Sequence, residues 1–382
     1  MTGVVVLGST GSIGRQTLEV LEAFPDRFRV VGLAAGRASP GFGEQLARWP
    51  EARAWCAEGR PREVEPARWV AGGLEQLATL DGAAMVVVAT TGMAALPAVL
   101  AALASGRRVA LANKETLVTG GHLVARQMAA LGGDPLDRLR PIDSEHSAIW
   151  QCLVGERLGD VRRLILTASG GPFRDRPADE LAGVTAADAL AHPTWKMGPK
   201  ITIDSATLVN KAFEAIEARW LYRLPYDRIQ AVIHPQSVVH SMVEFSDGSY
   251  KAQLGLPDMR LPIQYALTYP ERWPSPARHG SPGEWGSLEF GELAPGRFPA
   301  YDAVRDAALA GGNRGAILNA ADEAAVAAFL AGTIAFPQIA TVIADAVARW
   351  GGDEEPELEA VVALDAEVRS ALTAELGLAG PA

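Results

Sequence analysis

A short apolar segment near the start of the sequence runs into a turn that is rich in glycine. Val4–Leu7 is β-branched and apolar, as in a buried strand. Gly8, Gly11 and Gly14 follow, and a helical pattern begins at about Ser12. Glycines at such a turn let the backbone bend sharply and approach a pyrophosphate. A plain glycine-rich turn is the alternative, because the GxxGxxG spacing is less specific than GxGxxG. Its place after a first strand nevertheless predicts a dinucleotide-binding unit.

Apolar runs alternate with helical patterns over the first part of the chain. We expect strands at Phe28–Ala34, Met85–Ala89 and Arg108–Leu111, each followed by a helix. This alternation predicts an α/β fold with a Rossmann-like, doubly wound parallel sheet. The uncharged stretch Met85–Ala104 is about long enough to span a bilayer. Its β-branched start, glycine and proline favour a buried strand followed by a helix instead.

The pattern changes after residue 140 and divides the chain into four predicted segments. Strand signals joined by Asp247-Gly248, a typical hairpin turn, mark the second segment as α+β. The last segment is rich in alanine at helical spacing. We expect a Rossmann-like cofactor domain at 1–140, a catalytic α+β domain at 141–269, a linker at 270–299 and a small α-helical domain at 300–382.

Composition narrows the possible functions. The 382 residues are 48% hydrophobic with a net charge of -10, which argues against a nucleic-acid binder or a basic membrane-surface protein. Cys56 and Cys152 fit no metal or redox spacing, so we expect free thiols in a reducing compartment. No secretion signal is evident in the sequence. These features together predict a cytoplasmic protein.

The segment after the second predicted strand indicates which dinucleotide would bind. An NAD site places a carboxylate there for the ribose 2′-hydroxyl. No Asp or Glu occurs between Arg27 and Gly43, and the segment offers Arg37 and Ser39 instead. A guanidinium and a hydroxyl suit a 2′-phosphate, so we predict NADP over NAD. The alternative is that Arg37 is an exposed loop residue.

Two carboxylates lie two positions apart at Asp143 and Glu145. In an extended segment both would point the same way, and with Glu214 they would form a hard oxygen site for Mg²⁺ or Mn²⁺. The alternative is a helix start, with Asp143 or Ser144 as the cap. His146 is interpreted as a structural histidine.

Three polar residues, Asn113, Lys114 and Glu115, follow another predicted strand. Ligands bind at the carboxyl ends of the strands in such sheets. These residues are therefore candidates for the site, and a Lys–Glu pair in a polar loop is the alternative.

Residues 192–214, HPTWKMGPKITIDSATLVNKAFE, are too polar and irregular for a core. We expect a loop followed by a helix from about Ser205, with Asp204 or Ser205 as its N-cap. Such a helix N-terminus favours an anion. Thr207, Asn210, Lys211 and Glu214 would then share one helical face. An ordinary surface Lys211–Glu214 pair is the alternative.

Two weaker signals also follow predicted strands. Ser169 precedes two glycines in TASGGPF and could approach a phosphate, although a simple turn is the alternative. HPQS offers His234 and Ser237 to a cleft.

Taken together, these motifs resemble the 1-deoxy-D-xylulose 5-phosphate reductoisomerase family. The resemblance runs in order through nearly the whole chain, by way of GSTGSIG, LANKE, DSEH, SGGPF, HPTWKMG, DSATLVNKAFEAIEARWL, HPQSVVHSMVEF, LGLPDMR and LNAADEAAVAAFL. It implies an NADPH- and metal-dependent enzyme that rearranges and reduces a sugar phosphate. One departure is Ala38, where the family often has Asn after the basic residue.

The resemblance implies a role for each matching residue. The cofactor would contact Thr10, Gly11, Ser12, Ile13, Gly36, Arg37, Asn113, Glu115 and Gly198. The metal would bind Asp143, Glu145 and Glu214. The substrate would contact Lys114, Ser144, Glu145, Ser169, His192, Ser205, Asn210, Lys211 and Glu214, and the catalytic candidates are Lys114, Ser144, Glu145, His192 and His234. Trp195 and Met197 would lie on a loop that closes over the site.

The implied chemistry agrees with these residue types. A divalent metal would polarise the ketone and stabilise developing charge, and NADPH would then reduce the rearranged aldehyde. The resemblance also implies a homodimer, with the hairpin at Asp247-Gly248 as a candidate contact. Two alternatives are an NADP-dependent oxidative decarboxylase or hydroxy-acid dehydrogenase, which predicts substrate-binding arginines, and a nucleotide-sensing regulator without chemistry.

Overall fold

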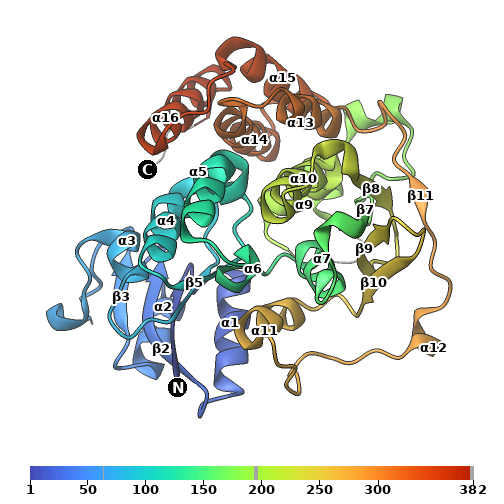
Figure 1. The fold of residues 1–382 in the computed structure, drawn as a ribbon. Coiled ribbons are helices and arrows are strands. Elements are labelled where there is room, and N and C mark those ends of the chain that lie inside the picture. The colour runs from blue at the N-terminus through green and yellow to red at the C-terminus, as the bar shows by residue number, and fades with distance from the viewer. Residues whose placement is uncertain (63, 193–196, 379–382) are drawn as a thin grey trace. The chain divides into compact units, whose positions relative to one another are not determined.

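The computed structural model describes residues 1–62, 64–192 and 197–378. These residues divide into two compact units. Figure 1 labels their helices and strands. Unit 1 comprises residues 1–116, 123–150 and 258–279, and unit 2 comprises residues 117–122, 151–257 and 280–382 as far as they are described. The predicted boundaries at 140 and 269 differ from this division, because residues 258–279 belong to unit 1, where they place α11 (Arg260–Thr268) against α1 (Ser12–Glu22).

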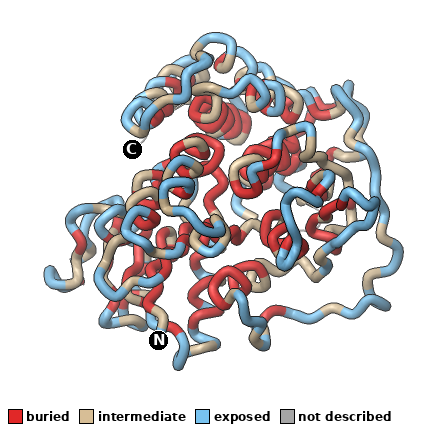
Figure 2. Tube along the Cα trace, in the orientation of Figure 1, coloured by how far each residue is buried: buried red, intermediate tan, exposed pale blue. Residues whose placement is uncertain are grey.

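Unit 1 is built on a six-stranded parallel sheet with the order β3-β2-β1-β4-β5-β6. This is the strand order of a doubly wound dinucleotide-binding fold, so the predicted Rossmann-like α/β architecture is confirmed. Buried residues run along its strands (Figure 2). The strands are β1 (Thr2–Leu7), β2 (Phe28–Ala35), β3 (Arg53–Cys56), β4 (Met85–Val88), β5 (Arg108–Leu111) and β6 (Leu139–Pro141).

Helices connect these parallel strands. The stretch with a bilayer-length run of uncharged residues divides into β4 and α4, as expected. No helix in the described part of the chain has both the length and the hydropathy to cross a membrane. Besides α1 and α11, the helices are α2 (Pro40–Arg48), α3 (Gly73–Ala78), α4 (Leu96–Ala104), α5 (Glu115–Leu131), α6 (Pro135–Arg138) and α7 (Ser144–Leu153), of which α5 and α7 have residues in both units.

Unit 2 contains a mixed five-stranded sheet with the order β10-β9-β7-β8-β11. β7 pairs parallel with β8 and antiparallel with β9, and β9 and β10 form the hairpin predicted at Asp247-Gly248. Gly248 has a φ of 85°, a conformation that glycine adopts readily. The strands are β7 (Val161–Ala168), β8 (Ile229–Ile233), β9 (Val239–Phe245), β10 (Tyr250–Leu254) and β11 (Gly291–Glu292).

The helices of unit 2 share one hydrophobic core. Phe213 and Ile216 from the middle of the chain pack in the same cluster as Ile317 and Phe329 from its last part. The predicted C-terminal helical domain therefore has no separate core. The helices are α8 (Ala186–Leu190), α9 (Pro199–Thr207), α10 (Val209–Tyr222), α12 (Pro282–Trp285), α13 (Pro299–Ala310), α14 (Arg314–Ala331), α15 (Gln338–Trp350) and α16 (Leu358–Glu375).

The prediction that a helix begins at about Ser205 is wrong. α9 begins at Pro199, with Gly198 as its N-cap, because proline is favoured in the first turn of a helix. Ser205 therefore lies in the last turns of α9 and caps nothing at its start. Leu208 adopts a left-handed conformation with a φ of 59° and ends α9 immediately before α10.

This break separates residues that we expected on one helical face. Thr207 belongs to α9, whereas Asn210, Lys211 and Glu214 belong to α10. Asp204 also lies inside α9 rather than at its N-cap.

Candidate active site

The turn between β1 and α1 has the shape that a dinucleotide diphosphate needs. Gly8 has a φ of 81°, and a Cβ there would lie 2.4 Å from the carbonyl oxygen of Ala89. A Cβ at Gly14 would lie 2.2 Å from the Gly8 carbonyl oxygen, so α1 packs directly on the turn. Gly11 is the N-cap of α1, and the first amides of a helix favour an anion. The predicted cofactor contacts here are Thr10, Gly11, Ser12 and Ile13.

The loop after β2 presents a cation beside a helix start. Arg37 is exposed, and Ser39 caps α2 by accepting a hydrogen bond of 3.3 Å from the amide of Phe42. The amide of Ala38 donates a hydrogen bond of 2.9 Å to Glu58 Oε2. Glu58 follows β3, so this carboxylate comes from outside the segment directly after β2.

The polar residues after β5 and β6 meet at one edge of the unit 1 sheet. Lys114 Nζ lies 2.8 Å from Asp143 Oδ2, and the two side chains are only 9% and 12% exposed. Asn113 faces inward at 1% exposure, where its amide donates to the carbonyls of Thr90 and Gly92. Its Oδ1 accepts a hydrogen bond from the amide of Thr116. Asn113 thus joins the ends of neighbouring strands to the start of α5.

The DSEH motif begins α7 and is not extended. The Asp143 carbonyl accepts the amide of Ser147, and Asp143 Oδ1 accepts the amide of Glu145 at 3.2 Å. The helix-cap interpretation therefore describes the backbone. Ser144 Oγ donates to Glu145 Oε2 at 2.7 Å. Two partly buried carboxylates consequently lie at the strand-end edge of the sheet, and their oxygens suit a hard divalent cation.

A histidine lies between two serines in unit 2. His192 Nε2 is 3.2 Å from Ser169 Oγ and 3.1 Å from Ser205 Oγ. Burial lowers the pKa of His192, which favours the neutral ring at pH 7. A Cβ at Gly171 would lie 2.6 Å from the Ser205 carbonyl oxygen, so the SGG turn packs closely on α9.

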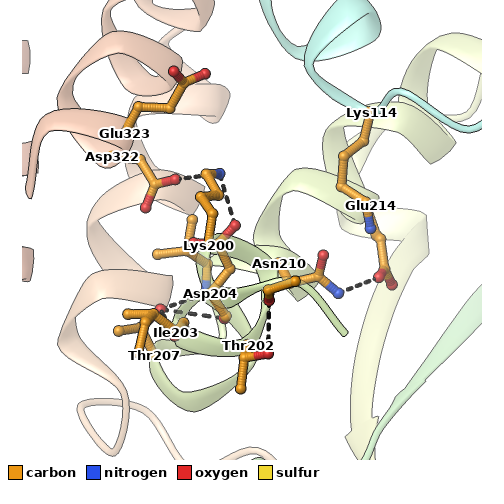
Figure 3. A network of polar contacts seen from close by, with 12 residues as sticks. Lys114, Lys200, Thr202, Ile203, Asp204, Thr207, Asn210, Glu214, Asp322 and Glu323 are labelled. Carbon is orange, nitrogen blue, oxygen red and sulfur yellow. Dashed lines mark hydrogen bonds and ion pairs between the residues drawn. The ribbon is translucent and has the colours of Figure 1, made fainter. Parts of the chain in front are cut away.

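The first turn and a half of α10 brings together an amide, a lysine and a carboxylate, and Figure 3 shows the amide of Asn210 directed toward Glu214. Asn210 Nδ2 donates to Glu214 Oε1 at 2.6 Å, and Lys211 forms an ion pair with the same carboxylate. Lys211 and Glu214 are 3% and 1% exposed. The alternative of an ordinary surface pair is therefore wrong.

His234, one of the predicted catalytic residues, makes its contacts with backbone groups. His234 Nδ1 lies 2.8 Å from the Glu289 carbonyl oxygen, and its Nε2 accepts the amides of Val238 and Val239. Because both ring nitrogens contact backbone groups, the geometry favours a structural role for His234 at the start of β9. Trp195 lies outside the described residues, and Met197 directly precedes the N-cap of α9.

Comparison with known proteins identifies the family. Residues 4–121 match the model described as 1-deoxy-D-xylulose 5-phosphate reductoisomerase, and residues 139–222 and 254–371 match models of the C-terminal domain of this enzyme. The reductoisomerase of Pelotomaculum thermopropionicum is 48% identical over 97% of both chains. That of Thermomicrobium roseum is 49% identical over 96% of both.

Solved structures agree with these relatives. A DOX-P reductoisomerase in complex with NADPH, fosmidomycin and magnesium has a TM-score of 0.88 and 35% identity, covering 99% of this chain and 98% of its own. The Zymomonas mobilis reductoisomerase in complex with NADPH has a TM-score of 0.87 and 38% identity, covering 98% and 99%. The chain therefore belongs to the 1-deoxy-D-xylulose 5-phosphate reductoisomerase family.

Proposed function

We propose that this chain converts 1-deoxy-D-xylulose 5-phosphate into 2-C-methyl-D-erythritol 4-phosphate, with NADPH and Mg²⁺ or Mn²⁺, on the non-mevalonate route to isoprenoid precursors. The observation that carries this proposal is the end-to-end similarity to a reductoisomerase solved with NADPH, fosmidomycin and magnesium. Residues 4–121, 139–222 and 254–371 also match models of this enzyme, which supports this activity over that of an oxidative decarboxylase or a regulator.

Most of the proposed cofactor contacts belong to unit 1. The β1–α1 turn suits the diphosphate, since any side chain at Gly8 or Gly14 would collide with backbone atoms. Arg37 and the first turn of α2 suit the 2′-phosphate. The set proposed to contact NADPH is Thr10, Gly11, Ser12, Ile13, Gly36, Arg37, Asn113, Glu115 and Gly198.

The metal would bind Asp143 and Glu145 together with Glu214. Carboxylate oxygens are the ligands that Mg²⁺ and Mn²⁺ prefer. When bound, the ion supplies Lewis acidity to the carbonyl and hydroxyl oxygens of the substrate, and NADPH supplies a hydride.

The chain's own residues would bind and orient the sugar phosphate. Ser169, Ser205, Asn210 and Lys211 offer two hydroxyls, an amide and an ammonium group, which suit the phosphate. His192 already contacts both serines, so in its neutral form it can orient their hydroxyl hydrogens. Lys114 would hold a positive charge near the substrate oxygen on which negative charge develops.

The chain would act as a cytoplasmic homodimer. β10 is an edge strand of the unit 2 sheet, and edge strands present backbone groups that a second chain can pair. Tyr250 and Leu254 on this strand are 51% and 38% exposed. Light scattering should give twice the monomer mass, and L254K should shift the mass toward the monomer.

A coupled assay tests the proposed activity. The wild-type chain should oxidise NADPH when both the sugar phosphate and Mg²⁺ or Mn²⁺ are present, and NMR should identify the branched product. Glu214→Gln should abolish turnover while leaving NADPH binding largely intact. Glu375→Gln, which removes an exposed carboxylate paired with Arg349, is the matched control and should keep full activity. A wild-type chain that leaves NADPH unoxidised under these conditions would contradict the proposal.

A further inference from the structure

One lysine at the start of α9 lies between two buried carboxylates. Lys200 Nζ is 2.7 Å from Asp204 Oδ2, one turn later on α9, and 2.6 Å from Asp322 Oδ2 on α14 (Figure 3). The side chains of Asp204 and Asp322 are 3% and 0% exposed, whereas that of Lys200 is 28% exposed. The same ammonium lies 5.2 Å from the ring centroid of Phe213 on α10.

These contacts differ from an ordinary surface ion pair. A buried carboxylate has lost its hydration, so removing its partner destabilises the protein much more than removing an exposed partner does. Here two such carboxylates on different helices share one ammonium. Lys200 therefore links the first turn of α9 to α14, which begins more than a hundred residues later in the sequence.

The position of α9 in turn determines where a proposed phosphate ligand lies. Ser205 directly follows Asp204, and its Oγ is 3.1 Å from His192 Nε2. The SGG turn that carries Ser169 packs against the backbone of Ser205. A small shift or rotation of α9 would therefore separate the hydroxyls of Ser205 and Ser169 from their common partner, His192.

We propose that Asp322 is a positioning residue for substrate binding. It holds Lys200, and through Lys200 it keeps α9 in the orientation that directs Ser205 toward the substrate phosphate. This inference rests on the proposed function. Through Asp322, the helix α14 would affect substrate affinity and also contribute to the core of unit 2.

The test uses Asp322→Asn in the full chain. Asparagine has the same size and keeps an oxygen for Lys200, but it lacks the charge. We expect the KM for the sugar phosphate and the inhibition constant of inorganic phosphate, competing with that substrate, to rise together by about ten- to a hundredfold. The dissociation constant of NADPH, measured by fluorescence, should change much less, because Gly198 is the one proposed cofactor contact at α9, whereas those of the β1–α1 turn and Arg37 lie in unit 1.

These readouts separate positioning from general loss of structure. A smaller fraction of folded enzyme lowers the maximal rate but changes neither KM nor an inhibition constant. Asp365→Asn is the matched control, because Asp365 is a buried aspartate on α16 that pairs with Arg369 and Asn319. It should lower the free energy of unfolding and leave both constants unchanged.

A second variant covers the case in which Asp322→Asn does not fold. Lys200→Arg keeps the positive charge but is longer and planar, so it should fold, displace α9 and raise the same two constants. Unchanged constants in the folded variants would overturn the positioning role, as would an equal rise in Asp365→Asn. A wild-type chain without turnover would instead overturn the proposed function, and the positioning role with it.

Discussion

Lys114 Nζ lies 2.8 Å from Asp143 Oδ2, which pairs the lysine at the start of α5 with the aspartate that caps α7. Asp143 Oδ1 accepts a hydrogen bond from the amide of Glu145, and Asp143 Oδ2 contacts the ammonium group of Lys114. Asp143 is thus held in place by two independent contacts. A proposed metal ligand with so little freedom loses little conformational entropy when an ion binds.

Removing the charge of Asp143 should weaken metal binding. Asp143→Asn keeps an oxygen to cap α7, so the fold should persist, but we expect Mn²⁺ affinity to fall by more than about tenfold in a calorimetric titration. Asp134→Asn is the matched control, since Asp134 caps the short helix α6 through the amide of Leu136. Equal Mn²⁺ affinity in all three proteins would contradict the assignment of Asp143 as a ligand.

Glu58 should oppose the binding of a 2′-phosphate. Its carboxylate accepts the amide of Ala38, next to Arg37, and so places negative charge in the loop proposed for that phosphate. Glu58→Gln should tighten NADPH binding by about two- to fivefold, an effect typical of one exposed charge, and leave NADH binding unchanged. Fluorescence titrations with NADPH and with NADH give the ratio of the two dissociation constants. Glu75→Gln, an exposed change on α3, should leave it unaltered, and an equal effect of Glu58→Gln on NADPH and NADH would refute the argument.

A methyl group at Gly14 should distort the cofactor turn. Its Cβ would lie 2.2 Å from the Gly8 carbonyl oxygen, so α1 would have to move away from the turn. We expect Gly14→Ala to raise the NADPH dissociation constant. It should also lower the free energy of unfolding, measured by urea unfolding, by about 1–3 kcal/mol. At Gly43 in α2 nothing lies within 4 Å of an added Cβ. Gly43→Ala should therefore be neutral or stabilise by up to about 1 kcal/mol.

Acid should destabilise the protein through His192. Burial lowers the pKa of His192 below its ordinary value of 6.5, so below that pH the unfolded chain binds more protons than the folded one. The free energy of unfolding therefore rises with pH up to about 6.5 and falls as the pH decreases from there. Urea unfolding at several pH values should show this slope, and His192→Gln should reduce it. The same slope in both proteins would assign the effect to other groups.

Regular patterns made most of unit 1 predictable. Each parallel strand that is buried on both faces is an unbroken apolar run, as at Val4–Leu7, and the glycine turn marks where the first helix begins. The strands β3 and β6 are not apolar runs of this kind, since their sequences are RAWC and LRP. β3 and β6 have only four and three residues. α11 returns to unit 1 from a distant part of the sequence, which no local pattern reveals.

The site was harder to predict because its backbone and side-chain contacts are not periodic. Leu208 takes a left-handed conformation without being glycine, asparagine or aspartate, so nothing in the sequence marks the end of α9 there. Glu58 reaches the cofactor loop from another strand, and Asp322 reaches Lys200 from another helix. Contacts of this kind depend on the tertiary fold and not on spacing along the chain.

The one-residue junction at Leu208 limits how this segment can evolve. A longer loop could absorb an insertion or a deletion, but α9 and α10 follow each other with no spare residue. One added or deleted residue would turn all of α10 by about 100° about its axis. Asn210, Lys211 and Glu214 would keep their contacts with one another but would together face another direction, so substitutions can accumulate at this corner while changes of length cannot.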